Sequence, residues 1–171
     1  MDVDRLFRAY NTMLVRYLTR RLGDRDWAEE VAQEVFVRAL RQSVLTNERA
    51  WLFTVANNLV RDAARKDARR RRRLAVLREQ TRDDVAEPEP TTVERAQEAA
   101  FARKAVETLA ERDRTALLMR EEGLDYNEIA QALGLSIGSI GTTLSRARRR
   151  LVENYEALQR EREQREGHAA S

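Results

Sequence analysis

Residues 125–144 read DYNEIAQALGLSIGSIGTTL, and this segment predicts a helix followed by a tight turn and a second helix. Asp125 and Glu128 have the three-residue spacing of a capping box, which predicts a helix over residues 126–133. Gly134 predicts the end of this helix, because glycine readily adopts the left-handed backbone conformation that closes a helix. The segment therefore predicts a compact pair of helices in the carboxyl-terminal half of the chain.

The second helix of the pair is expected to begin after Ser136, whose hydroxyl would cap it, and to run to about Tyr155. Ala130 is small where two helices must cross, and Ile140 is placed to pack the second helix inward. These features are typical of a helix-turn-helix, whose second helix lies in the major groove of DNA. A helical hairpin with a solvated basic face is the alternative interpretation. The candidate DNA contacts on the second helix, expected to be exposed, are Ser136, Ser139, Thr142, Thr143, Arg146, Arg149 and Arg150.

The amino-terminal part of the chain predicts three amphipathic helices that bury one face against one another, since apolar residues recur there every three or four positions. Gly23 is the predicted end of the first helix, and Asn47 lies near the start of the third. Asp26, followed by Glu29, resembles a capping box at the start of the second helix. The predicted buried positions are Val3, Leu6, Phe7, Tyr10, Leu14, Tyr17 and Leu18, then Ala28, Val31, Ala32, Val35, Ala39 and Leu40, and then Leu52, Val55, Ala56, Leu59 and Ala63.

The third helix carries an aromatic residue, amides and cations away from its apolar stripe. This set comprises Trp51, Thr54, Asn58, Arg61, Asp62 and Arg65. Aromatic rings stack on bases, amides read base edges and cations bind phosphates, so the combination suits single-stranded DNA. By composition alone, Trp51 fits a core position equally well. The run Arg69–Arg73 is a candidate phosphate-binding segment, or else a solvated helix end.

Charge divides the chain into two parts around an acidic linker. Residues 61–78 hold nine Lys/Arg against two Asp/Glu, whereas residues 79–98 hold seven acidic against two basic residues. Both prolines of the chain, at positions 88 and 90, lie within this acidic stretch. We therefore predict an all-α fold with two small helical domains joined by a flexible linker. The expected boundaries are 1–78 for the first domain, 79–97 for the linker, 98–155 for the second domain and 156–171 for a charged tail, which is expected to be a frayed helix with a disordered end.

Several classes of protein are excluded by what the sequence lacks. The 171 residues include no cysteine and a single histidine, His168, so no metal site or cofactor is expected. An enzyme is disfavoured because no glycine-rich phosphate loop and no paired catalytic groups are recognisable. No apolar run is long enough to span a membrane, which predicts a cytoplasmic protein with no membrane contact of its own.

The order of these motifs resembles extracytoplasmic-function sigma factors of the sigma-70 family. The segments 6–10 (LFRAY), 28–40 (AEEVAQEVFVRAL) and 50–62 (AWLFTVANNLVRD) are similar to conserved region two. Segment 109–114 (LAERDR) and the helix-turn-helix are similar to region four. Three positions depart from the usual pattern: Gly141 and Thr143 stand where basic residues are common, and Ala110 stands where proline is common.

The resemblance implies a protein that binds core RNA polymerase and directs transcription from particular promoters. It implies polymerase docking through Glu30, Gln33, Glu34, Phe36 and Arg38, although the alternative for these positions is an ordinary charged helix surface. It implies recognition of the melting minus-ten element by Asn47, Arg49, Trp51, Asn57, Asn58, Arg61, Asp62, Arg65 and Lys66. The helix-turn-helix would then read the minus-thirty-five element as duplex DNA.

Two expectations about partners follow from the same resemblance. An anti-sigma factor would cover the polymerase-docking surfaces until a stress signal releases it, and the acidic linker would run near the RNA exit path of the polymerase. The competing function is a free-standing helix-turn-helix regulator that binds its operator without polymerase. Dependence of promoter binding on core polymerase distinguishes the two.

Overall fold

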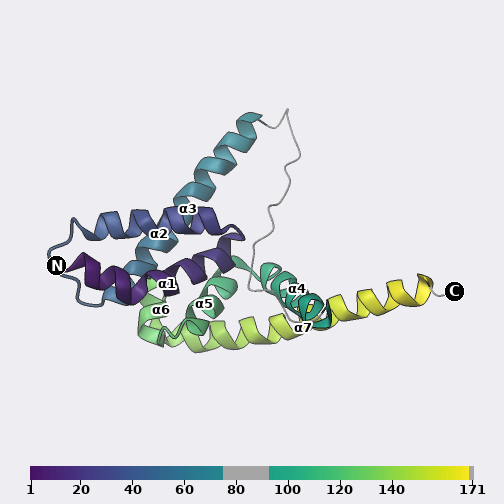
Figure 1. Ribbon diagram of the computed structural model, residues 1–171. Coiled ribbons are helices and arrows are strands. Elements are labelled where there is room, and N and C mark those ends of the chain that lie inside the picture. The colour runs from purple at the N-terminus through teal and green to yellow at the C-terminus, as the bar shows by residue number, and fades with distance from the viewer. Residues whose placement is uncertain (75–92, 170–171) are drawn as a thin grey trace. The chain divides into compact units, whose positions relative to one another are not determined.

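The computed structural model describes residues 1–74 and 93–169, with side chains placed for residues 1–67 and 93–168. Within these ranges the fold is all-α, with seven helices and no strand, as predicted. The helices are α1 (Val3–Leu22), α2 (Arg25–Ala39), α3 (Glu48–Leu74), α4 (Val93–Glu107), α5 (Glu111–Glu121), α6 (Tyr126–Leu133) and α7 (Ile137–Ala169) (Figure 1). The side chains of the Arg69–Arg73 run and residues 79–92 of the predicted linker lie outside the described residues, whereas residues 93–97 begin α4.

The first compact unit is built on α1, α2 and α3, which pack against one another around an apolar core. Tyr17 and Phe53 are fully buried, and their ring centroids lie 4.9 Å apart. The apolar stripes predicted from the sequence form most of this core, since large aliphatic and aromatic side chains gain most from removal from water. Two predicted core positions are wrong, because Phe7 is 44% exposed and Leu40 is 65% exposed.

The helix ends of this unit follow from short polar residues and one glycine. The Asp2 side chain accepts from the Arg5 amide at the start of α1, and Gly23 closes α1 with a φ of 71°. At the start of α2 the capping residue is Asp24, which accepts from the Trp27 amide, so the predicted Asp26 capping box is wrong. Asp24 is the acceptor because it keeps the extended backbone of a capping residue, whereas Asp26 already lies in the first helical turn. Asn47 accepts a bond from the Ala50 amide just before the start of α3, which was predicted to begin near Asn47.

Residues 118–137, which include the last turn of α5 and all of α6, belong to the same first unit. The capping box of Asp125 and Glu128 is confirmed, with both reciprocal bonds formed at 2.8 Å. Gly134 has a φ of 64° and closes α6, which confirms its predicted role. Within this unit α6 packs against α3.

The second compact unit contains α4, α5 up to Leu117, and α7 from Gly138. Leu109, Leu117 and Ala147 form a buried cluster, and Leu151 packs against it. The Asn154 amide donates to the Thr108 hydroxyl at 2.9 Å.

The tail, which was predicted as a frayed helix with a disordered end, is helical to Ala169. Salt bridges between residues four apart, such as Arg162 with Glu166 at 2.7 Å, stabilise a helix whose side chains are solvated. The Arg162 guanidinium also lies 5.7 Å from the centroid of the Phe101 ring of α4. Within the described ranges, no helix combines the length and the apolar character needed to cross a membrane.

Candidate nucleic-acid and polymerase interfaces

The outer face of α3 displays most of the residues predicted to bind the minus-ten element. The side chains of Asn58, Arg61, Asp62, Arg65 and Lys66 are exposed, and Trp51 is half-buried. Positions 58, 61, 62 and 65 recur at the three- and four-residue spacing that places side chains on one helix face. This face therefore offers an aromatic ring, an amide and several cations to a ligand.

Asn57 does not share that exposed face, because its side chain is fully buried. The Arg21 guanidinium donates to the Asn57 Oδ1 atom, and also donates to the Tyr17 hydroxyl at 3.1 Å. The Asn57 amide nitrogen lies 3.5 Å from the carbonyl oxygen of Ala132 in α6. In this conformation Asn57 is a buried polar link between α1, α3 and α6, and it is not available to a DNA base.

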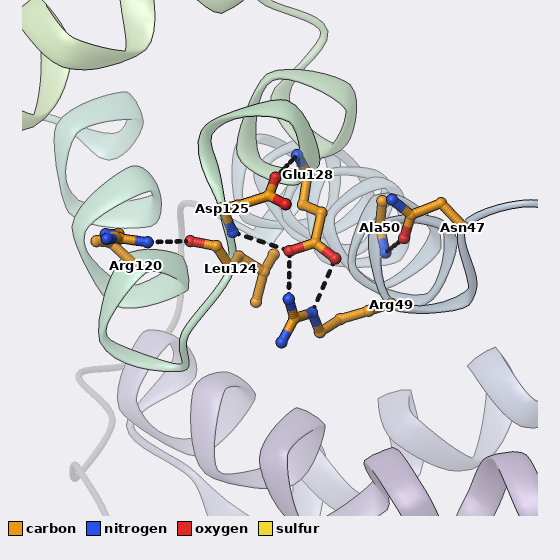
Figure 2. A network of polar contacts seen from close by, with 7 residues as sticks. All are labelled: Asn47, Arg49, Ala50, Arg120, Leu124, Asp125 and Glu128. Carbon is orange, nitrogen blue, oxygen red and sulfur yellow. Dashed lines mark hydrogen bonds and ion pairs between the residues drawn. The ribbon is translucent and has the colours of Figure 1, made fainter.

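Arg49, another predicted minus-ten residue, is held by a carboxylate of α6 (Figure 2). Its Nε and Nη2 atoms donate to Oε1 and Oε2 of Glu128 at 2.9 and 2.6 Å. This hydrogen bond is the main reason that the pKa of Arg49 is raised above its ordinary value. Figure 2 also shows Asn47 capping α3 nearby, so this predicted residue has a structural bond in place.

The exposed face of α2 carries four of the five predicted polymerase-docking residues, namely Glu30, Gln33, Glu34 and Arg38. Arg38 donates to Glu34 at 2.9 Å along the helix surface. Phe36 differs from them because only 5% of its surface is exposed. Its ring makes an edge contact with Phe7, with centroids 5.0 Å apart. Phe36 is thus mainly a core residue, and Phe7 beside it is half-exposed.

In the helix-turn-helix segment, Ser136, Thr142, Arg149 and Arg150 are exposed and Ser139 is half-buried. The expectation that Thr143 is exposed is wrong, since it is only 5% exposed. Residues 140, 143, 144 and 147 follow the period of a buried helix face, and position 143 falls on it. Ile140 is fully buried, in agreement with the inward packing expected for it.

Arg146 forms an ion pair inside the second unit. It donates to Asp113 of α5 through Nε at 2.9 Å and through Nη2 at 2.5 Å. Asp113 is 2% exposed, and its hydrogen bond to Arg146 is the main reason that its pKa is lowered. The side chain of Arg146 is 39% exposed, so one edge of the guanidinium still faces solvent. Arg146 therefore ties the recognition helix to α5.

The sequence-based prediction missed the buried charged residues. Arg21, Asp113 and Glu122 are buried and make polar contacts across helices, and the partner of Glu122 is the exposed Arg16. Glu128 was recognised only as a capping residue. Glu122 follows Arg120 and Glu121 in the sequence, so no local signal marks it as buried, and its partner depends on packing. In the described ranges, no three His, Cys, Asp or Glu residues are grouped closely enough to hold a metal ion.

Comparisons with known proteins match the segments that carry these surfaces. Residues 6–70 match the family model "Sigma-70 region 2", and residues 102–151 match "Sigma-70, region 4". The chain is 30% identical over 155 residues to the ECF RNA polymerase sigma factor SigL of Mycobacterium tuberculosis, covering 85% of this chain and 84% of that protein. It is 28% identical over 158 residues to the RNA polymerase sigma factor YlaC of Bacillus subtilis, covering 90% and 91%.

A solved structure has a similar fold. It is the sigma factor RpoE in complex with the anti-sigma factor NepR from Bartonella quintana, with a TM-score of 0.72 and 24% identity. The match covers 91% of this chain and 97% of that chain. At 24% identity this similarity shows a shared fold and nothing more.

Proposed function

The chain belongs to the extracytoplasmic-function family of RNA polymerase sigma factors, and we propose which of its surfaces bind the polymerase and which bind promoter DNA. A sigma factor binds core RNA polymerase and directs it to promoter DNA, and it is not an enzyme. The proposal assigns polymerase binding and minus-ten recognition to residues 1–78, and minus-thirty-five recognition to residues 98–155.

Polymerase docking is assigned to the exposed face of α2. Glu30, Gln33, Glu34 and Arg38 are accessible there without any rearrangement. Phe36 contributes by packing beneath this face rather than by direct contact, because its ring is buried against the core. Half-exposed Phe7 extends the same surface with an apolar edge, which suits a protein partner.

Recognition of the melted minus-ten element is assigned to the outer face of α3. The single observation that carries this assignment is the exposed row of Asn58, Arg61, Asp62 and Arg65 beside half-buried Trp51. An unstacked base captured against an aromatic ring offsets part of the cost of opening the duplex, which is a few kcal/mol per base as a rough figure. The cations of the row would hold the phosphates on either side of such a base.

Recognition of the minus-thirty-five element is assigned to the first turns of α7, with Ser136, Ser139, Thr142, Arg149 and Arg150 as contacts. Thr143 and Arg146 are proposed to act indirectly, since one is buried and the other is bonded to Asp113. Gly141 carries no side chain at a position where basic residues are common in the family. We therefore expect this chain to rely on backbone and phosphate contacts more than on base-reading side chains at that position.

Transcription with purified core polymerase tests the assignment to α3. We expect the double variant R61A/R65A to bind core polymerase normally and to fail in promoter opening, because two phosphate contacts are lost. The matched control is R160A/R165A, which removes the same charge from the exposed distal part of α7. Equal promoter opening by the two variants would refute the assignment, and operator binding by the chain without polymerase would favour the alternative regulator function.

Control by an anti-sigma factor in the cytoplasm is proposed as well. Its support is the fold shared with the Bartonella quintana sigma factor that was crystallised with NepR. The chain has no cysteine, so a thiol-based signal would have to be sensed by the partner. Isolation of the chain from cells with no bound inhibitor under any growth condition would contradict this proposal.

A further inference from the structure

An ion pair joins the first turn of α1 to the first turn of α3. The Arg5 Nη2 atom donates to the Oε1 atom of Glu48, a residue 43 positions further along the chain. The Arg5 side chain is 54% exposed and that of Glu48 is 24% exposed, so the pair lies at the edge of the packing between the two helices. This bond is the main reason that the pKa of Arg5 is raised above its ordinary value. Neither residue belongs to the surfaces assigned to polymerase or to DNA.

Glu48 lies on the same face of α3 as the residues assigned to the minus-ten element. Positions 48, 51, 55, 58 and 62 follow one another at three- and four-residue spacing, which places their side chains along one side of a helix. Trp51 and Asn58 belong to the assigned row, and Glu48 continues that row to the first residue of α3. Arg5 therefore contacts α3 at the amino-terminal end of this face, one turn before Trp51.

The first turn of α3 is held less firmly by the apolar core than the turns after it. Leu52 and Phe53 are fully buried and anchor the body of the helix, whereas Glu48 and Trp51 before them are only half-buried. The Trp51 amide donates to the Asn47 carbonyl at 3.0 Å, but this bond joins two residues of the same segment. The ends of a helix fray when nothing else holds them. The pair with Arg5 ties this turn to a second helix.

We propose that Arg5 and Glu48 are positioning residues, which hold the first turn of α3 so that the Trp51 ring presents one fixed geometry to an unstacked minus-ten base. The proposal rests on the assignment of α3 to minus-ten recognition. A ring on a frayed turn adopts several orientations, and it stacks on any base because every base has an aromatic face. A fixed ring sets where the strand lies along the face that carries Asn58, whose amide is suited to reading base edges. The pair thus contributes to selectivity among bases more than to affinity for DNA.

Amide hydrogen exchange of the free full-length chain tests the link between the helices. R5A removes the guanidinium and keeps the backbone amide that bonds to Asp2, so α1 keeps its cap. The matched control is R8A, which removes the same charge from an exposed position one turn further along α1. We expect the Trp51 amide to exchange about two- to fivefold faster in R5A than in R8A, since a partly exposed ion pair changes a local equilibrium by about that factor. Equal exchange in the two variants would overturn the proposal.

Promoter selectivity tests the consequence for recognition. The measured quantity is the ratio of transcripts made with core polymerase from a promoter that the chain recognises and from the same promoter with one minus-ten base changed. We expect this ratio to fall about two- to fivefold in R5A and to stay unchanged in R8A. If R5A lost transcription from both templates by the same factor, Arg5 would contribute only its charge, and the positioning role would be refuted.

Reversal of the pair separates positioning from the loss of a side chain. E48R places two arginines side by side, whereas R5E/E48R restores an ion pair in the opposite sense. Both variants put a cation at the amino terminus of α3, where the helix dipole disfavours it, so E48R is the reference for the double variant. We expect R5E/E48R to be the more selective of the two and to exchange more slowly at Trp51, and equal behaviour would contradict the proposal. Failure of the unmodified chain to start transcription would instead count against the proposed function, because the exchange contrast does not depend on polymerase.

Discussion

Asn57 and Asn58 are neighbours in α3 with opposite surroundings, so alanine substitution of each should have a different effect. Asn57→Ala removes a fully buried amide that bonds to Arg21 and to the Ala132 carbonyl. Leaving such buried groups without a partner costs about 1–3 kcal/mol. Asn58→Ala removes an exposed side chain, and such changes usually stay within about 0.5 kcal/mol.

Thermal unfolding followed by circular dichroism measures the first effect, and transcription with core polymerase measures the second. Each kcal/mol lowers the melting temperature of a unit of this size by about 4–8 °C. We therefore expect N57A to unfold at a clearly lower temperature than the unmodified protein. At temperatures well below its melting temperature, N57A should still open promoters. N58A should unfold like the unmodified protein and lose promoter opening. If N57A kept full stability and lost promoter opening, the conclusion that Asn57 is a core residue would be refuted.

Three further predictions concern single side chains. Asp113→Asn should remove a contribution to stability that depends on pH, because the hydrogen bond from Arg146 lowers the pKa of Asp113 from its ordinary 3.8. The contribution is complete above pH 3.8 and is lost as the pH falls below it. The difference in unfolding free energy between variant and parent should therefore shrink in acid. Arg149→Ala should weaken upstream duplex binding by the holoenzyme and reduce the slope of log affinity against log salt by about 1, and an unchanged slope would argue against a phosphate contact. Phe36→Ala should destabilise the first unit by about 3–5 kcal/mol in denaturant unfolding, because its ring is buried against Phe7, whereas Gln33→Ala should leave stability unchanged and weaken polymerase binding.

Local signals predicted much of the fold. The capping box of Asp125 and Glu128, the left-handed glycines at 23 and 134, and the start of α3 near Asn47 depend on residues a few positions apart, and all are present. The prediction of Asp26 as a cap was wrong by two residues, because Asp24 offers the same side chain two positions earlier. The tail was predicted as a frayed helix with a disordered end, and its helix extends to Ala169, since charged residues spaced four apart can support a solvated helix without a core.

The exposed parts of the candidate interfaces were predicted better than the buried ones. Asn58, Arg61 and Arg65 lie on a face that the apolar period of α3 already defines. Asn57 and Thr143 are polar residues on buried faces, and composition favours exposure for both types. The neighbouring residues in the sequence do not indicate that either side chain is buried.

The sequence by itself determined the helices, their caps, the helix-turn-helix and the family, because each of these depends on spacing along the chain. Only the tertiary structure decided that Arg49 bonds to Glu128, that Glu122 meets Arg16, and that Asp113 holds Arg146. These pairs are separated by 79, 106 and 33 residues, and many arginines compete for each carboxylate. The choice among them is made by packing, since a buried carboxylate is stable only beside the one cation that the fold brings within hydrogen-bonding distance.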